Sequence, residues 1–153
     1  MNNALMFSSK SDEWSTPQDT FNALHAEFGF QIDLAASAEN TKCSVWFSLE
    51  HSALDHAWRV EPHVARGWLN PPYSRGLCAK FIAKAADERR KGFLTVMLLP
   101  ARTDTKAFHA HIYNAKFWQP RFGVEIRLLP GRLKFGGCKD AAPFPSMVVV
   151  FRP

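Results

Sequence analysis

The stretch Phe93-Leu-Thr-Val-Met-Leu-Leu99 is a continuous apolar run, and it decides the fold class of this 153-residue chain. Such a run is typical of a strand that is buried on both faces of a parallel sheet. Just before it, apolar residues recur at helical spacing between Leu77 and Ala85, and Gly92 predicts the end of a helix over 77–91. We therefore expect a helix that leads directly into a buried central strand.

The rest of the chain extends this pattern to a larger sheet. Thr16-Pro17 predicts the start of a helix, with Thr16 as the N-cap and Pro17 as the first helical residue, and Gly29 predicts its end. The other expected elements are strands over 30–34, 45–47 and 64–69, a helix over 104–114, a strand that begins at 116–118, and strands over 124–129, 132–135 and 146–151. The sequence thus predicts an α/β fold, with a mostly parallel central sheet and a C-terminal antiparallel hairpin.

Length and composition predict one domain. A chain of 153 residues with 46% hydrophobic residues is large enough to bury its own core. We expect a flexible N-terminal lead-in over 1–13 and a single domain over 14–153. No apolar run approaches the roughly 18 residues that a membrane span needs, and residues 1–10 lack the pattern of a signal peptide. We therefore expect no membrane partner and a cytoplasmic protein.

The cysteines and histidines do not form a metal-binding pattern. Cys43, Cys78 and Cys138 are odd in number and lack the paired spacing of a structural zinc site. His109 and His111 are two residues apart on a predicted helix, so they would not share a face. We expect reduced cysteines and no metal.

Charge is distributed unevenly along the chain. Residues 1–60 hold 3 Lys or Arg against 8 Asp or Glu, whereas residues 61–153 hold 16 against 6. A basic half of this kind indicates a polyanionic partner such as a nucleic acid, and a solvated basic surface is the alternative. The candidate contact residues are Arg75 and the group Arg127, Arg132, Lys134 and Lys139.

Distinctive residues follow two of the expected strands. Asp33 precedes the small residues Ala35 and Ala36, and the next strand ends at Asn70-Pro-Pro-Tyr-Ser74. Ligands of open α/β sheets bind outside the carboxyl ends of the strands, which is where both groups should lie. The two prolines fix their own φ and restrict the residues before them, so the loop is a stiff array of one amide, carbonyl acceptors and one aromatic ring. This array suits a planar ligand that carries an exocyclic amine.

These residues belong to a longer ordered set of motifs. From Trp14 to Phe151 the chain resembles the phage-encoded DNA N6-adenine methyltransferases, a compact branch of the S-adenosylmethionine-dependent methyltransferases. The motifs that carry the resemblance are Trp14-Ser-Thr-Pro17, Phe28-Gly-Phe30, Asp33-Leu-Ala-Ala36, Glu39-Asn40, Asn70-Pro-Pro-Tyr73-Ser74, Leu99-Pro-Ala-Arg102-Thr-Asp104, Gly131-Arg-Leu-Lys-Phe135 and Pro143-Phe-Pro-Ser-Met147. Asn-Pro-Pro-Tyr alone is shared with methyltransferases that act on RNA or on glutamine amides.

The resemblance implies a Rossmann-like class I methyltransferase fold that binds S-adenosylmethionine and acts on DNA in the cytoplasm of a bacterial host. The glycines that many methyltransferases carry after the first strand are replaced here by Ala35-Ala36-Ser37. No separate target-recognition domain fits within 153 residues. The cofactor-binding residues that the resemblance implies are Trp14, Thr16, Pro17, Asp33, Leu34, Ala35, Asn40 and Asp55.

The resemblance also implies a catalytic loop. Asn70 and the carbonyl of Pro71 would accept the two N6 hydrogens of adenine, Pro72 would stiffen the loop, and Tyr73 would stack on the flipped base. The residues expected to contact DNA are Ser74, Arg75, Arg102, Arg132 and Lys134.

Three alternatives remain open at this point. The chain could methylate adenine in RNA or a glutamine amide in protein, because the same hydrogen bonds serve all three amines. It could also be a nucleic-acid-binding protein that has lost catalysis. The sequence gives neither the target site nor the oligomeric state.

Overall fold

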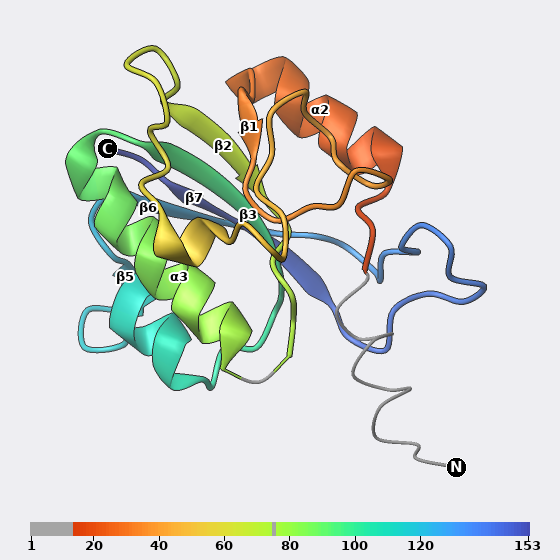
Figure 1. Ribbon diagram of the computed structural model, residues 1–153. Helices are drawn as coiled ribbons and strands as arrows, with labels where there is room; N and C mark the ends of the chain where they lie inside the picture. Colours follow the sequence, from red (N-terminus) through yellow and green to blue (C-terminus); the bar gives the residue numbers. More distant parts are fainter. Residues whose placement is uncertain (1–13, 75) are drawn as a thin grey trace.

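A five-stranded sheet of order β1-β2-β3-β7-β6 forms the centre of the computed structural model, which describes residues 14–74 and 76–153 (Figure 1). Strands β1 (Ile32–Asp33), β2 (Arg66–Leu69) and β3 (Leu94–Pro100) pair in parallel. Strand β7 (Ser146–Phe151) is antiparallel to both of its neighbours, β3 and β6 (Val124–Leu128). The expected α/β class, the mostly parallel centre and the C-terminal antiparallel pair are confirmed.

Helices cover both faces of this sheet. Helix α3 (Leu77–Glu88), extended by the 3-10 turn η2 (Arg89–Lys91), lies in front of the sheet in Figure 1. The π-helical turn η3 (Phe108–Ile112) packs beside α3, and the short 3-10 helix η1 (Ala53–Asp55) also contacts it. Helix α2 (Gln18–Phe28) packs with the loop between β6 and β7 on the opposite face.

The two hydrophobic cores follow from alternation along the central strands. In β3, Met97 and Leu99 belong to the core under α3, whereas Val96 and Leu98 belong to the core under α2. All four are at most 1% exposed. The apolar run in the sequence is continuous because this strand needs apolar side chains on both of its faces.

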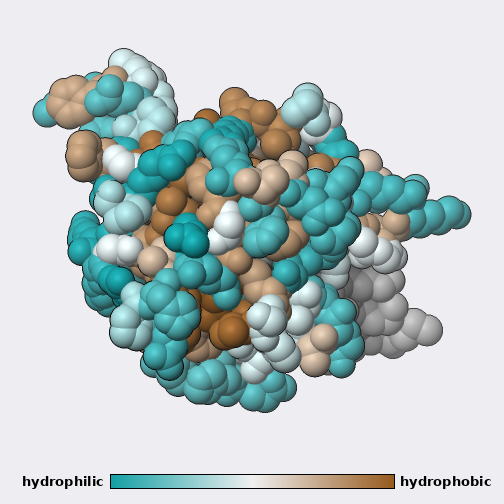
Figure 2. All heavy atoms as spheres, turned by 90° about the horizontal axis from the view of Figure 1, so that it is seen from above, coloured by the Kyte–Doolittle hydropathy of each residue, from teal (hydrophilic) through white to brown (hydrophobic). Residues whose placement is uncertain are grey.

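Hydrophilic spheres cover most of the surface in Figure 2, and hydrophobic ones show mainly near the middle of that view. Large exposed hydrophobic side chains are few among the described residues: Val45, Trp46, Leu49, Val60, Phe117, Trp118, Phe122 and Leu128. No helix in the described residues is long and apolar enough to span a membrane.

Several expected elements differ in the structure. The helix expected over 104–114 ends in η3, and residues 113–114 form β4 (Tyr113–Asn114), which pairs with β5 (Gln119–Pro120). Residues 116–118, expected to begin a strand, form the turn between β4 and β5. The segment 45–47 makes a single bridge, from Trp46 to Asp33.

The strand expected over 132–135 is also absent. These residues run without regular structure, and Gly136 after them bridges to Ser15. Phe135 is 1% exposed and belongs to the core under α2. Its ring packs edge-on against Trp14 of the N-terminal segment, and the stretch pairs with no neighbouring strand among the described residues, so alternation misled the prediction.

The start of α2 lies one residue later than expected. Pro17, not Thr16, is the N-cap, and no side chain caps the helix. The hydroxyl of Thr16 instead accepts a hydrogen bond from Asn70. The prediction of Thr16 as a helix cap was therefore wrong, because a distant residue takes up its hydroxyl.

Candidate active site at the carboxyl edge of the sheet

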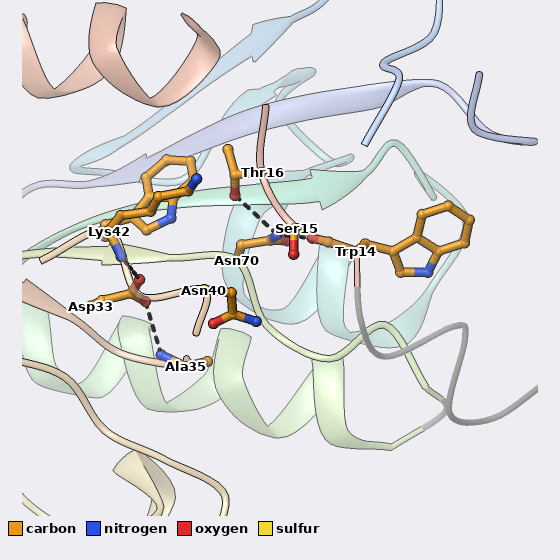
Figure 3. A pocket seen from close by; sticks show the side chains of 9 residues that line it. Trp14, Ser15, Thr16, Asp33, Ala35, Asn40, Lys42 and Asn70 are labelled. Carbon is orange, nitrogen blue, oxygen red and sulfur yellow. Dashed lines mark hydrogen bonds between the residues drawn. The ribbon is translucent and has the colours of Figure 1, made fainter. Parts of the chain in front are cut away.

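A pocket lies at the carboxyl ends of β1 and β2 (Figure 3). Two of its walls come from the expected strand ends, and a third comes from the segment that precedes α2. The lining residues are Trp14, Ser15, Thr16, Asp33, Ala35, Asn40, Lys42, Trp68 and Asn70. The structure thus brings six of the sequence-predicted residues, from three distant segments, into one pocket.

Asp33 is the carboxylate of this pocket. Its Oδ2 accepts from the backbone N–H of Lys42 at 2.9 Å, and its Oδ1 accepts from that of Ala35 at 3.3 Å. Asp33 is 3% exposed. Burial raises its pKa to about 6, although the two backbone donors and the charge of Lys42 act in the opposite direction. Since each carboxylate oxygen has two acceptor positions, the group can still bind a cation.

Asn70 connects the loop Asn70-Pro-Pro-Tyr-Ser74 (the proline loop) to the segment that precedes α2 by hydrogen bonds. Its Nδ2 donates to the carbonyl oxygen of Trp14 and, at 3.0 Å, to Oγ1 of Thr16. Because the carbonyl of Trp14 can only accept, the amide nitrogen must face it, and this fixes the orientation of the side chain. Oδ1 is thereby turned towards Tyr73, whose hydroxyl donates to it at 2.5 Å.

Tyr73 is positioned by contacts of both its hydroxyl and its ring. Its hydroxyl also lies 3.1 Å from the carbonyl oxygen of Leu98, and its ring meets Phe135 and Phe144 edge-on, with centroids 6.2 Å and 5.7 Å away. Only 4% of the residue is exposed. Burial raises the pKa of the phenol well above its ordinary value, so the hydroxyl keeps its proton and remains a donor to Asn70.

A second cavity, of about 370 Å³, also reaches Tyr73. Apolar side chains from α3, β3 and η3 form most of its wall, and Ser74, Arg102 and Lys106 lie among the lining residues. Ser74 and Arg102, both expected to contact DNA, therefore lie beside the proline loop. They do not share the pocket that contains Asp33 and Asn70.

Some of the residues expected to bind the cofactor do not line the pocket around Asp33 and Asn70 with their side chains. Leu34 is 1% exposed and belongs to the core under α3, while Pro17 caps α2. Asp55 is exposed in η1 and is not among the described residues that line the pocket. Pro71 is buried and Pro72 half-buried, which fits a supporting role in the loop.

The expected DNA contacts fall into separate groups. Arg132 and Lys134 are exposed in the loop between β6 and β7, whereas Arg75 lies outside the described residues. Arg127 pairs with Glu27 and Glu125, both at 2.6 Å. These two glutamates already neutralise the charge of Arg127 within the protein. The structure therefore favours a role for Arg127 in joining α2 to β6 over a role in binding nucleic acid.

Three lining residues were not predicted from the sequence. Ser15 and Trp68 lie within segments that carry a predicted motif or strand, but Lys42 gave no signal of its own. Lys42 reaches Asp33 because the chain folds back through a turn in which Asn40 Oδ1 accepts from the N–H of Ser37 at 2.7 Å. Among the described residues no group of three or more His, Cys, Asp or Glu side chains could hold a metal ion.

Comparisons with known proteins extend the likeness to nearly the whole chain. A family model described as DNA N-6-adenine-methyltransferase (Dam) matches residues 4–153. The DNA N-6-adenine-methyltransferase of Escherichia phage T1 is 38% identical over 105 residues, which are 68% of this chain and 42% of that protein. The one of Haemophilus phage HP1 is 29% identical over 153 residues, 95% of this chain and 81% of that protein.

A shorter match is a putative methyltransferase, YfdM, of Escherichia coli K12, 35% identical over 65 residues, which are 40% of this chain and 71% of that protein. The chain spans less than half the length of the phage T1 relative, at 42%. The family model nevertheless includes every residue of the pocket around Asp33 and Asn70. The chain belongs to the DNA N-6-adenine-methyltransferase family.

Proposed function

We propose that this chain transfers a methyl group from S-adenosylmethionine to the N6 amine of adenine in DNA. The observation that carries the proposal is that the Asp33 carboxylate and the oriented Asn70 amide line one pocket. The names of the phage relatives support DNA adenine as the substrate. The expected place of action is the cytoplasm of a bacterial host, and the expected unit is the single domain over 14–153.

The strand order supports a Rossmann-like methyltransferase fold within this proposal. Strand β7 is antiparallel to β3 and to β6, so it alone runs against the other four strands of the central sheet. Strands β1, β2 and β3 pair in parallel, so their carboxyl ends lie together at one edge of the sheet. Both proposed subsites, for the cofactor and for the amine, follow strands that end at this edge.

The pocket residues fit the amino-acid end of S-adenosylmethionine. Asp33 is buried and accepts hydrogen bonds from the backbone N–H groups of Ala35 and Lys42, and none of the ion pairs among the described residues includes it. A buried carboxylate of this kind is stabilised by an incoming ammonium group. When bound, S-adenosylmethionine supplies an electrophilic methyl group on its sulfonium.

Asn70 and Pro71 position the amine in this proposal. The lone pair of an adenine N6 amine is delocalised into the ring, so the amine is a weak nucleophile. If Asn70 Oδ1 and the Pro71 carbonyl each accept one N6 hydrogen, the nitrogen becomes more tetrahedral and its lone pair points at the methyl group. An amide is no strong base, so the proton leaves to water, and catalysis rests on positioning and electrostatics.

Tyr73 has two roles in the proposal. Its hydroxyl holds Asn70 Oδ1, which keeps a second lone pair for the substrate amine. Its ring is expected to stack on the flipped base, which requires Phe135 or Phe144 to move aside, since both rings now pack against it. Ser74, Arg75, Arg102, Arg132 and Lys134 are the proposed DNA contacts.

The test is to incubate the protein with isotope-labelled S-adenosylmethionine and, separately, with DNA, RNA and total protein. Each sample is digested, and the methylated species is identified by mass spectrometry. The expected product is N6-methyladenine in DNA. Label in RNA adenine or in a glutamine amide would select another substrate, and cofactor binding without any transfer would show a binding protein that has lost catalysis.

A further inference from the structure

The pocket around Asp33 contains one acidic and one basic side chain. Asp33 supplies the carboxylate and Lys42 the ammonium group, and the remaining lining residues are neutral. The backbone N–H of Lys42 donates to Asp33 Oδ2 at 2.9 Å, which fixes the start of the lysine side chain beside the carboxylate. In the view of Figure 3 the lysine side chain extends from Asp33 towards Thr16.

The ammonium group of Lys42 is only partly satisfied by the protein. Its Nζ donates to Oε1 of Gln18, a neutral amide, at 2.8 Å. None of the salt bridges formed by the described residues includes Lys42. An ammonium group has three donors, so two remain available for a ligand. The half-buried position of Lys42 lowers the competition from water for those donors.

A pocket with one fixed charge of each sign is complementary to a zwitterion. The amino-acid end of S-adenosylmethionine is such a group, because it carries an α-ammonium and an α-carboxylate on one carbon. We infer that Lys42 binds the α-carboxylate of the methyl donor while Asp33 binds its α-ammonium. This inference rests on the proposed function and adds a residue that selects the cofactor.

Gln18 has a positioning role in this arrangement. Its Oε1 accepts from Lys42 and its Nε2 donates to Oδ1 of Asn22 at 2.8 Å, so the lysine is held to the first turn of α2. The same turn follows Thr16, which Asn70 fixes by a hydrogen bond. The carboxylate subsite and the amine-positioning loop are thereby joined through one short segment.

The consequence is selectivity for an intact amino-acid group. Decarboxylated S-adenosylmethionine keeps the sulfonium, the methyl group and the amine but lacks the carboxylate. Lys42 then faces no partner, and the wild-type protein should bind this analogue more weakly by about tenfold, as expected for a partly buried charge-assisted contact. Because the carboxylate is far from the reacting methyl group, Lys42 should affect KM and leave kcat nearly unchanged.

The experiment compares the two ligands by calorimetry on the wild-type protein and on Lys42→Met, which keeps the length of the side chain and removes its charge. The variant should lose about tenfold in affinity for S-adenosylmethionine and bind the decarboxylated analogue as the wild type does, so that the preference disappears. Lys42→Arg should restore most of the preference. Lys116→Met, at an exposed turn far along the chain, is the matched control and should change neither affinity.

The outcomes separate this inference from the proposed function. If the wild-type protein binds S-adenosylmethionine and Lys42→Met keeps the full preference over the decarboxylated analogue, the role of Lys42 is refuted and the methyltransferase proposal stands. If Lys42→Met weakens both ligands equally, the lysine acts only on the structure of the pocket, which also refutes the inference. If the wild-type protein binds neither ligand, the proposed function itself fails.

Discussion

Two groups of carboxylates in this protein have opposite surroundings. At the carboxyl edge of the sheet, Asp33 is buried among backbone donors, and its pKa is raised to about 6. On the side where α2 meets β6, Glu27 and Glu125 pair with Arg127 at 2.6 Å, and those hydrogen bonds lower the pKa of both glutamates. Arg152 pairs with Glu125 as well, also at 2.6 Å.

The difference separates carboxylates that pair with cations of the protein from a carboxylate that has no such partner among the described residues. The glutamates have cationic partners within the protein, so a further cation would add little to them. Asp33 is ionised at a cost that the surrounding backbone offsets only in part, so a bound ammonium group would stabilise it. A buried carboxylate without a cationic partner is therefore the stronger mark of a binding site.

Methyl transfer should depend most strongly on Asn70. Asn70→Ala removes the proposed acceptor of the N6 hydrogen, and we expect transfer to fall by about 1,000-fold or more. Because Asn70 also holds Trp14 and Thr16, the variant should in addition lose several-fold in cofactor affinity. Transfer is measured by label incorporation and affinity by calorimetry.

Glu125→Ala is the matched control, since it removes the carboxylate that pairs with Arg127 and Arg152 at the surface. It should leave both transfer and cofactor affinity unchanged. Near-full transfer by Asn70→Ala would remove the loop from the mechanism. A loss in Glu125→Ala as large as in Asn70→Ala would mean that the two regions do not differ in function.

Cofactor affinity should depend on Asp33 more than on any surface carboxylate. Asp33→Ala is expected to weaken the binding of S-adenosylmethionine by about 100-fold, because a buried ion pair with the ligand is lost. Calorimetry measures this loss, and Glu27→Ala is the control with an exposed carboxylate. An unchanged dissociation constant for Asp33→Ala would take this residue out of the cofactor site.

The pH dependence of binding follows from the same carboxylate. Only the ionised form of Asp33 attracts an ammonium group, and its pKa is about 6 in the folded protein. Affinity for S-adenosylmethionine should therefore be greatest near pH 7, where Asp33 is ionised and the α-amine of the ligand is still protonated, and fall up to about tenfold for each pH unit below 6. Binding by Asp33→Asn should be weak and nearly independent of pH in this range. A wild-type affinity that stays constant down to pH 5 would contradict the assignment.

Stability should respond to pH with opposite signs in the two regions. The pKa of Asp33 is raised from 3.8 to about 6, so the folded state binds its proton more tightly than the unfolded state does. As pH rises from about 4 to 6, the wild type should therefore lose about 3 kcal/mol in free energy of unfolding relative to Asp33→Asn. Chemical denaturation at several pH values measures the difference.

Glu125 supplies the opposite case, because its pKa is lowered in the folded state. Its contribution is present above its ordinary pKa and is lost as pH falls through the folded value. Relative to Glu125→Gln, the wild type should lose a small amount of stability on acidification. Equal slopes for the two pairs would show that the environments of Asp33 and Glu125 do not differ as described.

Among the substitutions in the candidate site, Tyr73→Phe should have a modest effect on catalysis. Tyr73→Phe removes the hydrogen bonds to Asn70 and Leu98 while the ring keeps its place between Phe135 and Phe144. The amide of Asn70 remains held by its nitrogen, so we expect kcat to fall only about 3- to 20-fold. Single-turnover kinetics measure this loss, and a fall as large as that of Asn70→Ala would assign the hydroxyl a direct role.

The central elements could be predicted because their signals are local. The apolar run before Pro100 indicates a strand that is buried on both faces, and the helical spacing after Leu77 indicates a helix that is buried on one face. The structure confirms both elements, as β3 and α3. The stretch over 132–135 has the same kind of alternation but packs Phe135 against the core without pairing as a strand. Apolar alternation reports burial, and burial alone does not specify a hydrogen-bonded partner.

Local signals in the sequence were sufficient to predict the α/β class and the stiff loop that starts at Asn70, because backbone restriction by proline and apolar periodicity act over a few residues. The sequence also marked Asp33 as a candidate ligand group. Which charges face one another became visible in the folded chain: Arg127 pairs with Glu27 from 100 positions away, and Lys42 lies beside Asp33. Electrostatic partners are chosen by distance in space, and that distance exists only after the chain has folded.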